Sequence, residues 1–234
     1  FPFDTNKDLT LLQLCAHISP QAPPPWRWSI IFEQAWLETW KEHFQAVHCG
    51  GPLWVCPSWI TPPELDAVNV IIDPGLAFGT GNHATTSLCL QWLQQQNLAG
   101  ATVLDFGCGS GVLAIAACLL GAAHVIAVDN DPQALDATRD NAERNGVSAR
   151  VGAFLPEEFF VAGADVVMAN ILAGPLLELS QALLNILRPG GKLVLSGILE
   201  EQAVQLVETY RDSMNVINVT VQDGWVRLDG EKAA

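Results

Sequence analysis

From Val68 onward, short apolar runs alternate with longer segments whose apolar residues recur at helical spacing. The short runs predict buried strands, and the amphipathic segments between them predict helices. The predicted strands are 68–72, 103–106, 125–128, 150–154, 164–169 and 192–196. One predicted helix follows the loop 73–86 and ends near residue 96, and the others span 112–120, 132–145, 175–187 and 200–210. Strands that alternate with helices indicate an α/β fold, with a mostly parallel, doubly wound sheet that helices cover on both faces.

The two ends of the chain depart from this alternation. Two closing strands, 216–221 and 225–228, have no helix between them and predict a hairpin with one antiparallel strand at an edge of the sheet. Before residue 60 the predicted elements are a helix over 9–17, a strand over 26–32, a helix over 33–44 and a short strand over 53–59. We expect three regions: part of a small α+β domain in 1–32, a connecting helix and linker in 33–60, and the main domain in 61–234.

The strongest chemical signal is the segment Val103-Leu-Asp-Phe-Gly-Cys-Gly-Ser-Gly111, where a strand runs into three closely spaced glycines. Glycine allows a sharp turn and lets a ligand approach the main chain, so Gly107 and Gly109 are candidate cofactor contacts. The G-x-G-x-G spacing differs from the dinucleotide pattern G-x-G-x-x-G. Asp105 is the only charged residue between Pro74 and Val128, and a carboxylate in an apolar strand needs a partner. An ordinary strand-to-helix turn is the alternative interpretation.

Two further polar positions follow predicted strands. Asp129 comes after the strand 125–128, where doubly wound folds hold a ribose diol, although an acidic residue here also caps helices. Asp131 can supply that cap by itself. Asn170 follows the strand 164–169 and can donate and accept hydrogen bonds; its alternative role is also a helix cap. In the glycine-rich loop 73–86, Thr85 or Thr86 is expected to cap the next helix.

The three loops after the strands describe a site for an adenosine-bearing cofactor. They contain neither Lys nor Arg nor a phosphate-binding motif, which argues against ATP and NADP. S-adenosylmethionine fits better, because it carries a positive sulfonium and an ammonium group that Asp105 would attract.

Composition narrows the possible partners. A net charge of −14 disfavours direct contact with nucleic acid and favours a basic partner. The six cysteines form no C-x-x-C pattern, which is typical of reduced thiols in a cytoplasmic protein, and the histidines and cysteines do not predict a metal site. The uncharged run from Phe106 to Val128 is interrupted by glycines, so we expect no membrane span.

The sequence resembles class I methyltransferases and, more narrowly, the PrmA family of ribosomal protein L11 methyltransferases. The motifs that carry the resemblance are Asp73-Pro-Gly-Leu-Ala-Phe-Gly-Thr-Gly81, the loop Asp105–Gly111, Asp129-Asn-Asp-Pro-Gln-Ala134, Asp140-Asn-Ala-Glu-Arg-Asn-Gly146 and Asn170-Ile-Leu-Ala-Gly-Pro175. The glycine loop is common to the superfamily, whereas the first and last of these motifs are specific to the family.

The resemblance implies a seven-stranded Rossmann-like sheet of order 3-2-1-4-5-7-6, preceded by a small substrate-recognition domain to which residues 1–32 belong. It implies a protein N-methyltransferase that uses S-adenosylmethionine to methylate lysine side chains and the N-terminal amine of a basic large-subunit ribosomal protein. It places Thr86, Gly107, Asp129 and Asn170 at cofactor-contacting positions. Our full set of candidate cofactor residues is Thr86, Asp105, Gly107, Gly109, Asp129 and Asn170.

We also assign Asn170 as the candidate catalytic residue, because its amide can hold the incoming amine or the adjacent cofactor by hydrogen bonds. Two other functions stay open from the sequence. One is a class I methyltransferase for another protein or a small metabolite. The other is a cofactor-binding module without catalysis.

Overall fold

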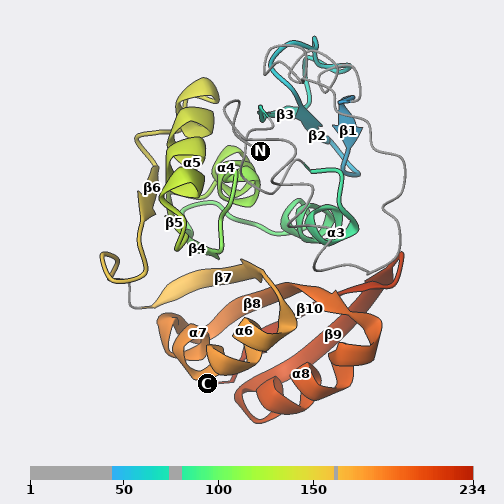
Figure 1. Cartoon of the computed structure of the whole chain (residues 1–234), viewed down its shortest axis with the longest axis vertical. Coiled ribbons are helices and arrows are strands. Elements are labelled where there is room, and N and C mark those ends of the chain that lie inside the picture. Colours follow the sequence, from blue (N-terminus) through green and yellow to red (C-terminus); the bar gives the residue numbers. More distant parts are fainter. Residues whose placement is uncertain (1–43, 74–80, 161–162, 234) are drawn as a thin grey trace, which may run out of the picture. The chain divides into compact units, whose positions relative to one another are not determined.

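The computed structural model of the chain describes residues 44–73, 81–160 and 163–233 (Figure 1). Contacts divide the chain into a unit over 1–43 and a unit over 44–234. The elements predicted over 9–17 and 26–32, and nearly all of the helix predicted over 33–44, lie outside the described residues. The fold below is therefore that of the second unit.

A seven-stranded sheet forms the centre of this unit, in the order β6-β5-β4-β7-β8-β10-β9. Its strands are β4 (Thr102–Phe106), β5 (His124–Val128), β6 (Val151–Phe154), β7 (Ala164–Asn170), β8 (Leu187–Leu199), β9 (Met214–Gln222) and β10 (Trp225–Lys232). Numbered within the sheet, this is the order 3-2-1-4-5-7-6. The predicted seven-stranded, mostly parallel sheet is confirmed.

The closing hairpin differs from the prediction in one respect. β10 is the antiparallel strand, and it lies between β8 and β9 rather than at the edge. The edge is formed by β9, because the helix after β8 carries the chain past one strand position before β10 returns to fill it. The apolar pattern predicts the hairpin correctly but misplaces its antiparallel strand, because strand order depends on pairing between distant residues. The order implied by the family resemblance is confirmed.

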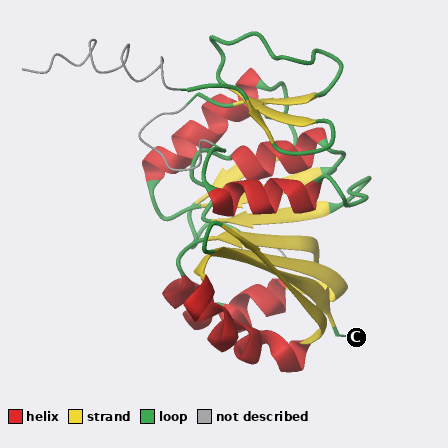
Figure 2. Ribbon diagram, turned by 90° about the vertical axis from the view of Figure 1, so that its right-hand side faces the viewer, coloured by secondary structure: helices red, strands yellow, loops and turns green. Residues whose placement is uncertain are grey.

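Helices cover both faces of the sheet (Figures 1 and 2). One set is α3 (Ala84–Leu93), α4 (Val112–Leu119) and α5 (Pro132–Arg144); the other is α6 (Ala173–Glu178), α7 (Ser180–Ile186) and α8 (Ala203–Tyr210), which follows the short 3-10 helix η1 (Glu200–Gln202) and precedes η2 (Arg211–Ser213). Each set packs on its own apolar cluster. The single helix predicted over 175–187 is two helices, because Leu179 has φ −90° and ψ 2° and interrupts the α-helical backbone.

A second, three-stranded sheet precedes α3, in the order β1 (Val47–His48), β2 (Leu53–Cys56) and β3 (Val68–Ile71). β3 follows the predicted strand 68–72 closely but pairs in parallel with β2, not with the main sheet. The strand predicted over 53–59 is observed as the shorter β2, whereas β1 was not predicted in the connecting segment 33–60. Apolar periodicity identified β3 as a strand but carried no information on which sheet it joins.

The charge-free run from Phe106 to Val128 is divided among the end of β4, α4 and β5. In the part of the chain that the structure describes, no helix is long and apolar enough to cross a membrane. The cysteines at positions 49, 56, 89, 108 and 118 are buried free thiols.

Two backbones approach closely where β8 passes the segment after β7. Gly197 in β8 has φ +83°, and a Cβ built on it would overlap the carbonyl oxygen of Ile171. The obstacle is main chain, which cannot rotate away as a side chain can.

Replacing Gly197 with Ala should therefore lower the free energy of unfolding by about 3 kcal/mol or more, because it combines a steric clash with an unfavourable φ. The matched control is Gly146→Ala, where φ is +67° and no atom lies within 4 Å of the added Cβ. The free energy of unfolding of that variant should fall by only about 1 kcal/mol. Urea unfolding measures both values, and equal losses would contradict the backbone clash.

Candidate functional site

The candidate site lies at the edge of the sheet where β4, β5 and β7 end. These three parallel strands are neighbours in the order β5-β4-β7, so the segments that follow them start side by side (Figure 1). The glycine loop follows β4, Asp129 follows β5, and Asn170 is the last residue of β7. Ligands of open α/β sheets bind outside the carboxyl ends of the strands. The structure thus brings together the three polar loops that the sequence singles out.

The glycine loop, residues 107–111, turns sharply away from β4. The amides of Gly107 and Cys108 both donate to the carbonyl oxygen of Val128, at 2.7 and 3.0 Å. Gly107, Gly109 and Gly111 have φ values of +79°, +54° and +78°, which L side chains rarely adopt. The glycine spacing is therefore required by the turn itself. This supports the alternative of a strand-to-helix turn as well as a close approach to a ligand.

One carboxylate oxygen of Asp129 holds the glycine loop, and the other holds the turn that leads from Asp129 into α5. Oδ2 accepts from the amide of Gly109 at 2.9 Å, and Oδ1 accepts from the amide of Asp131 at 3.0 Å. Each oxygen of an ionised carboxylate can accept about two hydrogen bonds. Both oxygens therefore keep capacity for a ligand's hydroxyl groups. Asp131 caps α5 by accepting from the amide of Gln133, so Asp129 is not needed as the cap.

Asn170 and Thr86 meet although they are far apart in the sequence. Asn170 Nδ2 donates to Thr86 Oγ1 at 3.3 Å, joining the end of β7 to the first turn of α3. The expected cap at Thr85 or Thr86 is wrong: both residues lie inside α3, and the cap is His83, whose Nδ1 accepts from the amide of Thr85. His83 has the extended backbone of a cap, whereas the two threonines are already helical.

Asp105 lies beneath the glycine loop, with only 1% of its surface exposed. Oδ2 accepts from the amide of Ala114 in α4 at 3.0 Å, and Oδ1 is buried without a hydrogen-bond partner in the described chain. Burial raises the pKa of Asp105 to about 7; the hydrogen bond from Ala114 opposes this rise, and the charge of Asp129 adds to it. An orphaned carboxylate oxygen in this position suits a cationic ligand group.

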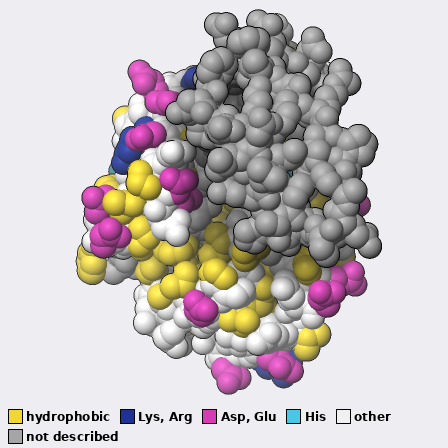
Figure 3. Space-filling model, in the orientation of Figure 1, with side chains coloured by type: hydrophobic (Ala, Val, Ile, Leu, Met, Phe, Trp, Pro, Cys, Tyr) yellow, Lys and Arg dark blue, Asp and Glu magenta, His cyan; other side chains and the backbone are white. Residues whose placement is uncertain are grey.

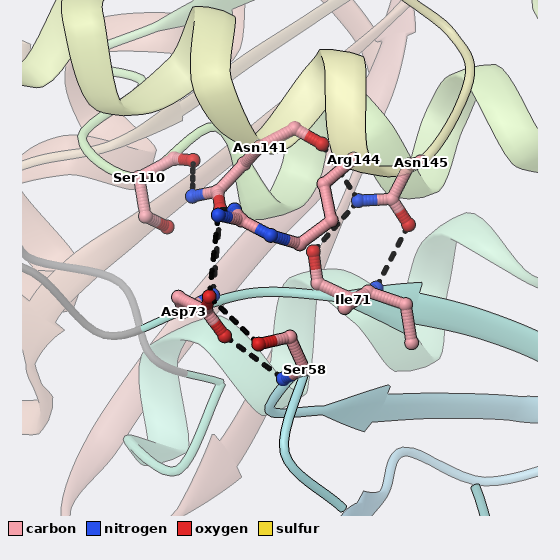
Figure 4. Close-up of polar contacts among 7 residues, drawn as sticks. All are labelled: Ser58, Ile71, Asp73, Ser110, Asn141, Arg144 and Asn145. Atoms are coloured by element: carbon pink, nitrogen blue, oxygen red, sulfur yellow. Dashed lines mark hydrogen bonds and ion pairs between the residues drawn. The ribbon is translucent and has the colours of Figure 1, made fainter. Parts of the chain in front are cut away.

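α5 supplies three residues to the site that the sequence interpretation did not assign. Thr138 Oγ1 donates to the carbonyl oxygen of Gly109 at 3.0 Å, and Asn141 Nδ2 donates to that of Ser110 at 3.0 Å. Arg144 contacts Asn141 and Asp73 (Figure 4). The available signal was the motif Asp140–Gly146, whose polar residues recur at positions that share one face of a helix.

Within 44–73, 81–160 and 163–233, His, Cys, Asp and Glu do not gather in a group of three that could hold a metal ion. The segment 74–80, with Phe78 and most of the Asp73–Gly81 motif, lies outside the described residues.

The buried carboxyl group of Asp105 gives the ligand-free protein a specific pH dependence. Because the pKa of Asp105 is about 7 in the folded protein and 3.8 as a model value, the folded state holds this proton more tightly than the unfolded state. The free energy of unfolding should therefore fall as the pH rises from about 4 to about 7, by an amount on the order of 4 kcal/mol, and level off above pH 7. Asp105→Asn should remove this part of the decline.

Urea titrations of both proteins between pH 4.5 and 8 measure the effect. The stability of the wild type relative to Asp105→Asn should decrease between pH 4.5 and about 7 and then level off. A difference that stays constant with pH would show that Asp105 does not change protonation there.

Comparisons with known proteins agree with this geometry. The model of the family described as "Ribosomal protein L11 methyltransferase (PrmA)" matches residues 1–233. The ribosomal protein L11 methyltransferase of Nitrosococcus oceani is 46% identical over 232 residues, which cover 99% of this chain and 80% of the relative. That of Photobacterium profundum is 49% identical over 234 residues, with the same coverage.

Solved structures of methyltransferases share this fold. A ribosomal protein L11 methylase from Lactobacillus delbrueckii subsp. bulgaricus is 30% identical, with a TM-score of 0.74 over 82% of this chain and 100% of that one. An RNA methyltransferase from Salinibacter ruber, solved with S-adenosyl-L-homocysteine, shares the fold with a TM-score of 0.51 and 19% identity, over 62% of this chain and 90% of that one. Family model, relatives and fold agree, and the chain belongs to the ribosomal protein L11 methyltransferase (PrmA) family.

Proposed function

We propose that the protein transfers methyl groups from S-adenosylmethionine to amino groups of ribosomal protein L11, at lysine side chains and the N-terminus. The observation that carries this proposal is the meeting of Asn170 and Thr86 beside the glycine loop, at the carboxyl edge of the sheet in a chain of this family. Methyl donation from S-adenosylmethionine is the chemistry of methyltransferases with this fold.

The residues at this edge suit the donor. Asp129 has acceptor capacity for two ribose hydroxyl groups, and the glycine loop offers main chain without side chains. The buried Oδ1 of Asp105 lacks a partner in the described chain, and a cationic donor group close to it would favour the ionised carboxylate. The loop 107–111, Asp129 and Asn170 provide no basic side chain for a phosphate. We therefore assign Thr86, Asp105, Gly107, Gly109, Asp129 and Asn170 to donor binding.

When bound, S-adenosylmethionine supplies a methyl group already activated by its sulfonium. The task left to the protein is to align a neutral amine with that group and to exclude water. A lysine amine has a reference pKa of about 10.4, so its deprotonation at pH 7 costs about 4.6 kcal/mol. Desolvation in a closed site lowers that cost. Asn170 holds the amine or the adjacent donor through its amide, while Thr86 fixes the orientation of that amide.

The charge of the protein suits a basic protein substrate. The chain carries 25 acidic and 11 basic residues. Acidic side chains are spread over the face in Figure 3, among exposed apolar ones, whereas Lys and Arg are few there. We assign residues 1–32 to a substrate-recognition domain and place the reaction in the cytoplasm, where ribosomal proteins are made. The acidic surface would attract a basic ribosomal protein and repel free nucleic acid.

Incubation of the protein with labelled S-adenosylmethionine and separated large-subunit ribosomal proteins tests this function. We expect label in L11 alone, at lysine side chains and the N-terminal amine, as read by mass spectrometry. Label in other proteins or only in small molecules would contradict the proposed substrate. Binding of the donor without transfer would contradict the proposed enzyme.

Removing the amide of Asn170 tests the catalytic assignment. Asn170→Ala should lower kcat by about a hundredfold, an effect similar to the loss of one preorganised hydrogen-bond donor in other active sites. Thr86→Val should give a smaller loss, because it removes only the partner of that amide. The matched control is Asn185→Ala, an exposed asparagine in α7 that bonds Gln181. Full turnover by Asn170→Ala would contradict the catalytic role of Asn170.

A further inference from the structure

A continuous series of polar contacts joins the small sheet to the glycine loop (Figure 4). It begins at Ser58, just after β2, whose amide and hydroxyl donate to the two carboxylate oxygens of Asp73 at 2.8 and 2.9 Å. Arg144 forms an ion pair with the same carboxylate at 3.2 Å. Asp73 stands where the chain leaves β3 toward α3, the helix that carries Thr86. Its carboxylate therefore holds Ser58 after β2 and Arg144 at the end of α5 next to the end of β3.

Asn141 continues the series from Asp73 to the glycine loop. Its Oδ1 accepts from Arg144 at 2.7 Å and from the amide of Asp73 at 3.3 Å, and its Nδ2 donates to the carbonyl oxygen of Ser110 at 3.0 Å. Asn141 is only 2% exposed. A buried amide that bonds at both ends has one allowed orientation, because rotation would leave polar atoms unpaired. Asn141 thus fixes the amide of Asp73 and the carbonyl oxygen of Ser110 relative to each other.

Asn145, one turn further along α5, strengthens the attachment of β3. Its Oδ1 accepts from the amide of Ile71 at 2.8 Å, and its Nδ2 donates to the carbonyl oxygen of the same residue at 2.6 Å. The side chain thus pairs with β3 much as a neighbouring strand would. The end of β3 and the C-terminal end of α5 are therefore held together at two nearby positions, Ile71 and Asp73.

The stability of α5 does not require this arrangement. Asp131 caps the helix and Pro132 occupies its first turn, while Leu135 and Ala142 bury its apolar face in the core. Thr138, Asn141 and Asn145 instead bond main-chain atoms of two other segments. One segment leads to Thr86, and the other is the glycine loop. Both belong to the proposed donor site.

We propose that Asn141 is a positioning residue for donor binding: through Ser110 and Asp73 it sets the glycine loop against the end of β3, with Arg144 fixing its amide. This inference rests on the proposed donor site. Asn141 acts through the backbone and does not touch the donor. Its loss should weaken the binding of the donor in its ground state, which raises KM and leaves kcat nearly unchanged.

The variant Asn141→Asp isolates the contact with Ser110. The carboxylate keeps the acceptor toward Arg144 and Asp73, but it faces the carbonyl oxygen of Ser110 with an acceptor instead of a donor. Calorimetry should show S-adenosylhomocysteine binding at least tenfold weaker than in the wild type, and KM for S-adenosylmethionine should rise similarly with kcat within threefold. The matched control is Asp136→Ala, which removes the exposed Asp136–Arg139 ion pair of the same helix and should change affinity less than twofold.

A merely structural role gives a different result: a lower melting temperature with unchanged affinity for S-adenosylhomocysteine, and this would overturn the proposal. If Asn141→Asp does not fold, Asn141→Ala and Arg144→Gln replace it under the same criteria. A measurement on the wild type needs no variant. Because the amide of Asp73 donates to Asn141, S-adenosylhomocysteine should slow its hydrogen exchange at least tenfold, and unchanged exchange would also overturn the proposal.

The binding measurements distinguish failure of the positioning role from failure of the proposed donor site. If the wild type fails to bind S-adenosylhomocysteine, the proposed donor site is wrong. If the wild type and Asn141→Asp bind it equally well, the donor site stands and only the positioning role falls.

Discussion

The carbonyl oxygen of Val128 accepts hydrogen bonds from two successive amides, and the geometry of the site depends on this arrangement. Two neighbouring amides can point at one acceptor only if the chain turns tightly, which Gly107 permits with its positive φ. The interaction ties the exit of β4 to the end of β5. It also starts the turn that leads into α4, whose Ala114 amide then reaches the buried carboxylate of Asp105.

Three polar side chains around this turn bond the backbone of the glycine loop itself. Asp129 and Thr138 hold the amide and the carbonyl oxygen of Gly109, and Asn141 holds the next carbonyl oxygen. The loop is thus preorganised from both sides, so less conformational entropy is lost when a ligand binds. Truncation of the Asp129 side chain would therefore remove a contact of the glycine loop together with the proposed ligand contact.

Local sequence patterns were sufficient for most of the fold. Apolar runs located every strand of the main sheet, and Asp131-Pro132 located the start of α5. The patterns failed where the outcome depends on distant partners: β3 joined the small sheet, and β10 entered the main sheet between β8 and β9. The cap of α3 was missed because His83 is a less common cap than threonine.

The same distinction applies to the candidate site. Asp129 follows β5, Asn170 ends β7 and Asp105 is the last residue but one of β4, so topology alone predicts that they gather at one edge. The contact between Asn170 and Thr86 links residues on different elements and follows only from the packed structure. The roles of Thr138 and Asn141 were hidden in a helix whose polar residues look like an ordinary solvated face. Burial, which one sequence does not reveal, distinguishes them.

Ile171 follows Asn170 and is confined on two sides by glycines. A Cβ on Gly197 would meet its main chain, whereas a Cβ on Gly107 would meet only its side chain. The two glycines are therefore constrained differently. A smaller residue at position 171 would relieve the steric conflict at position 107, where the positive φ still requires glycine. No exchange at position 171 makes room beside Gly197, so both space and backbone conformation keep glycine at that position.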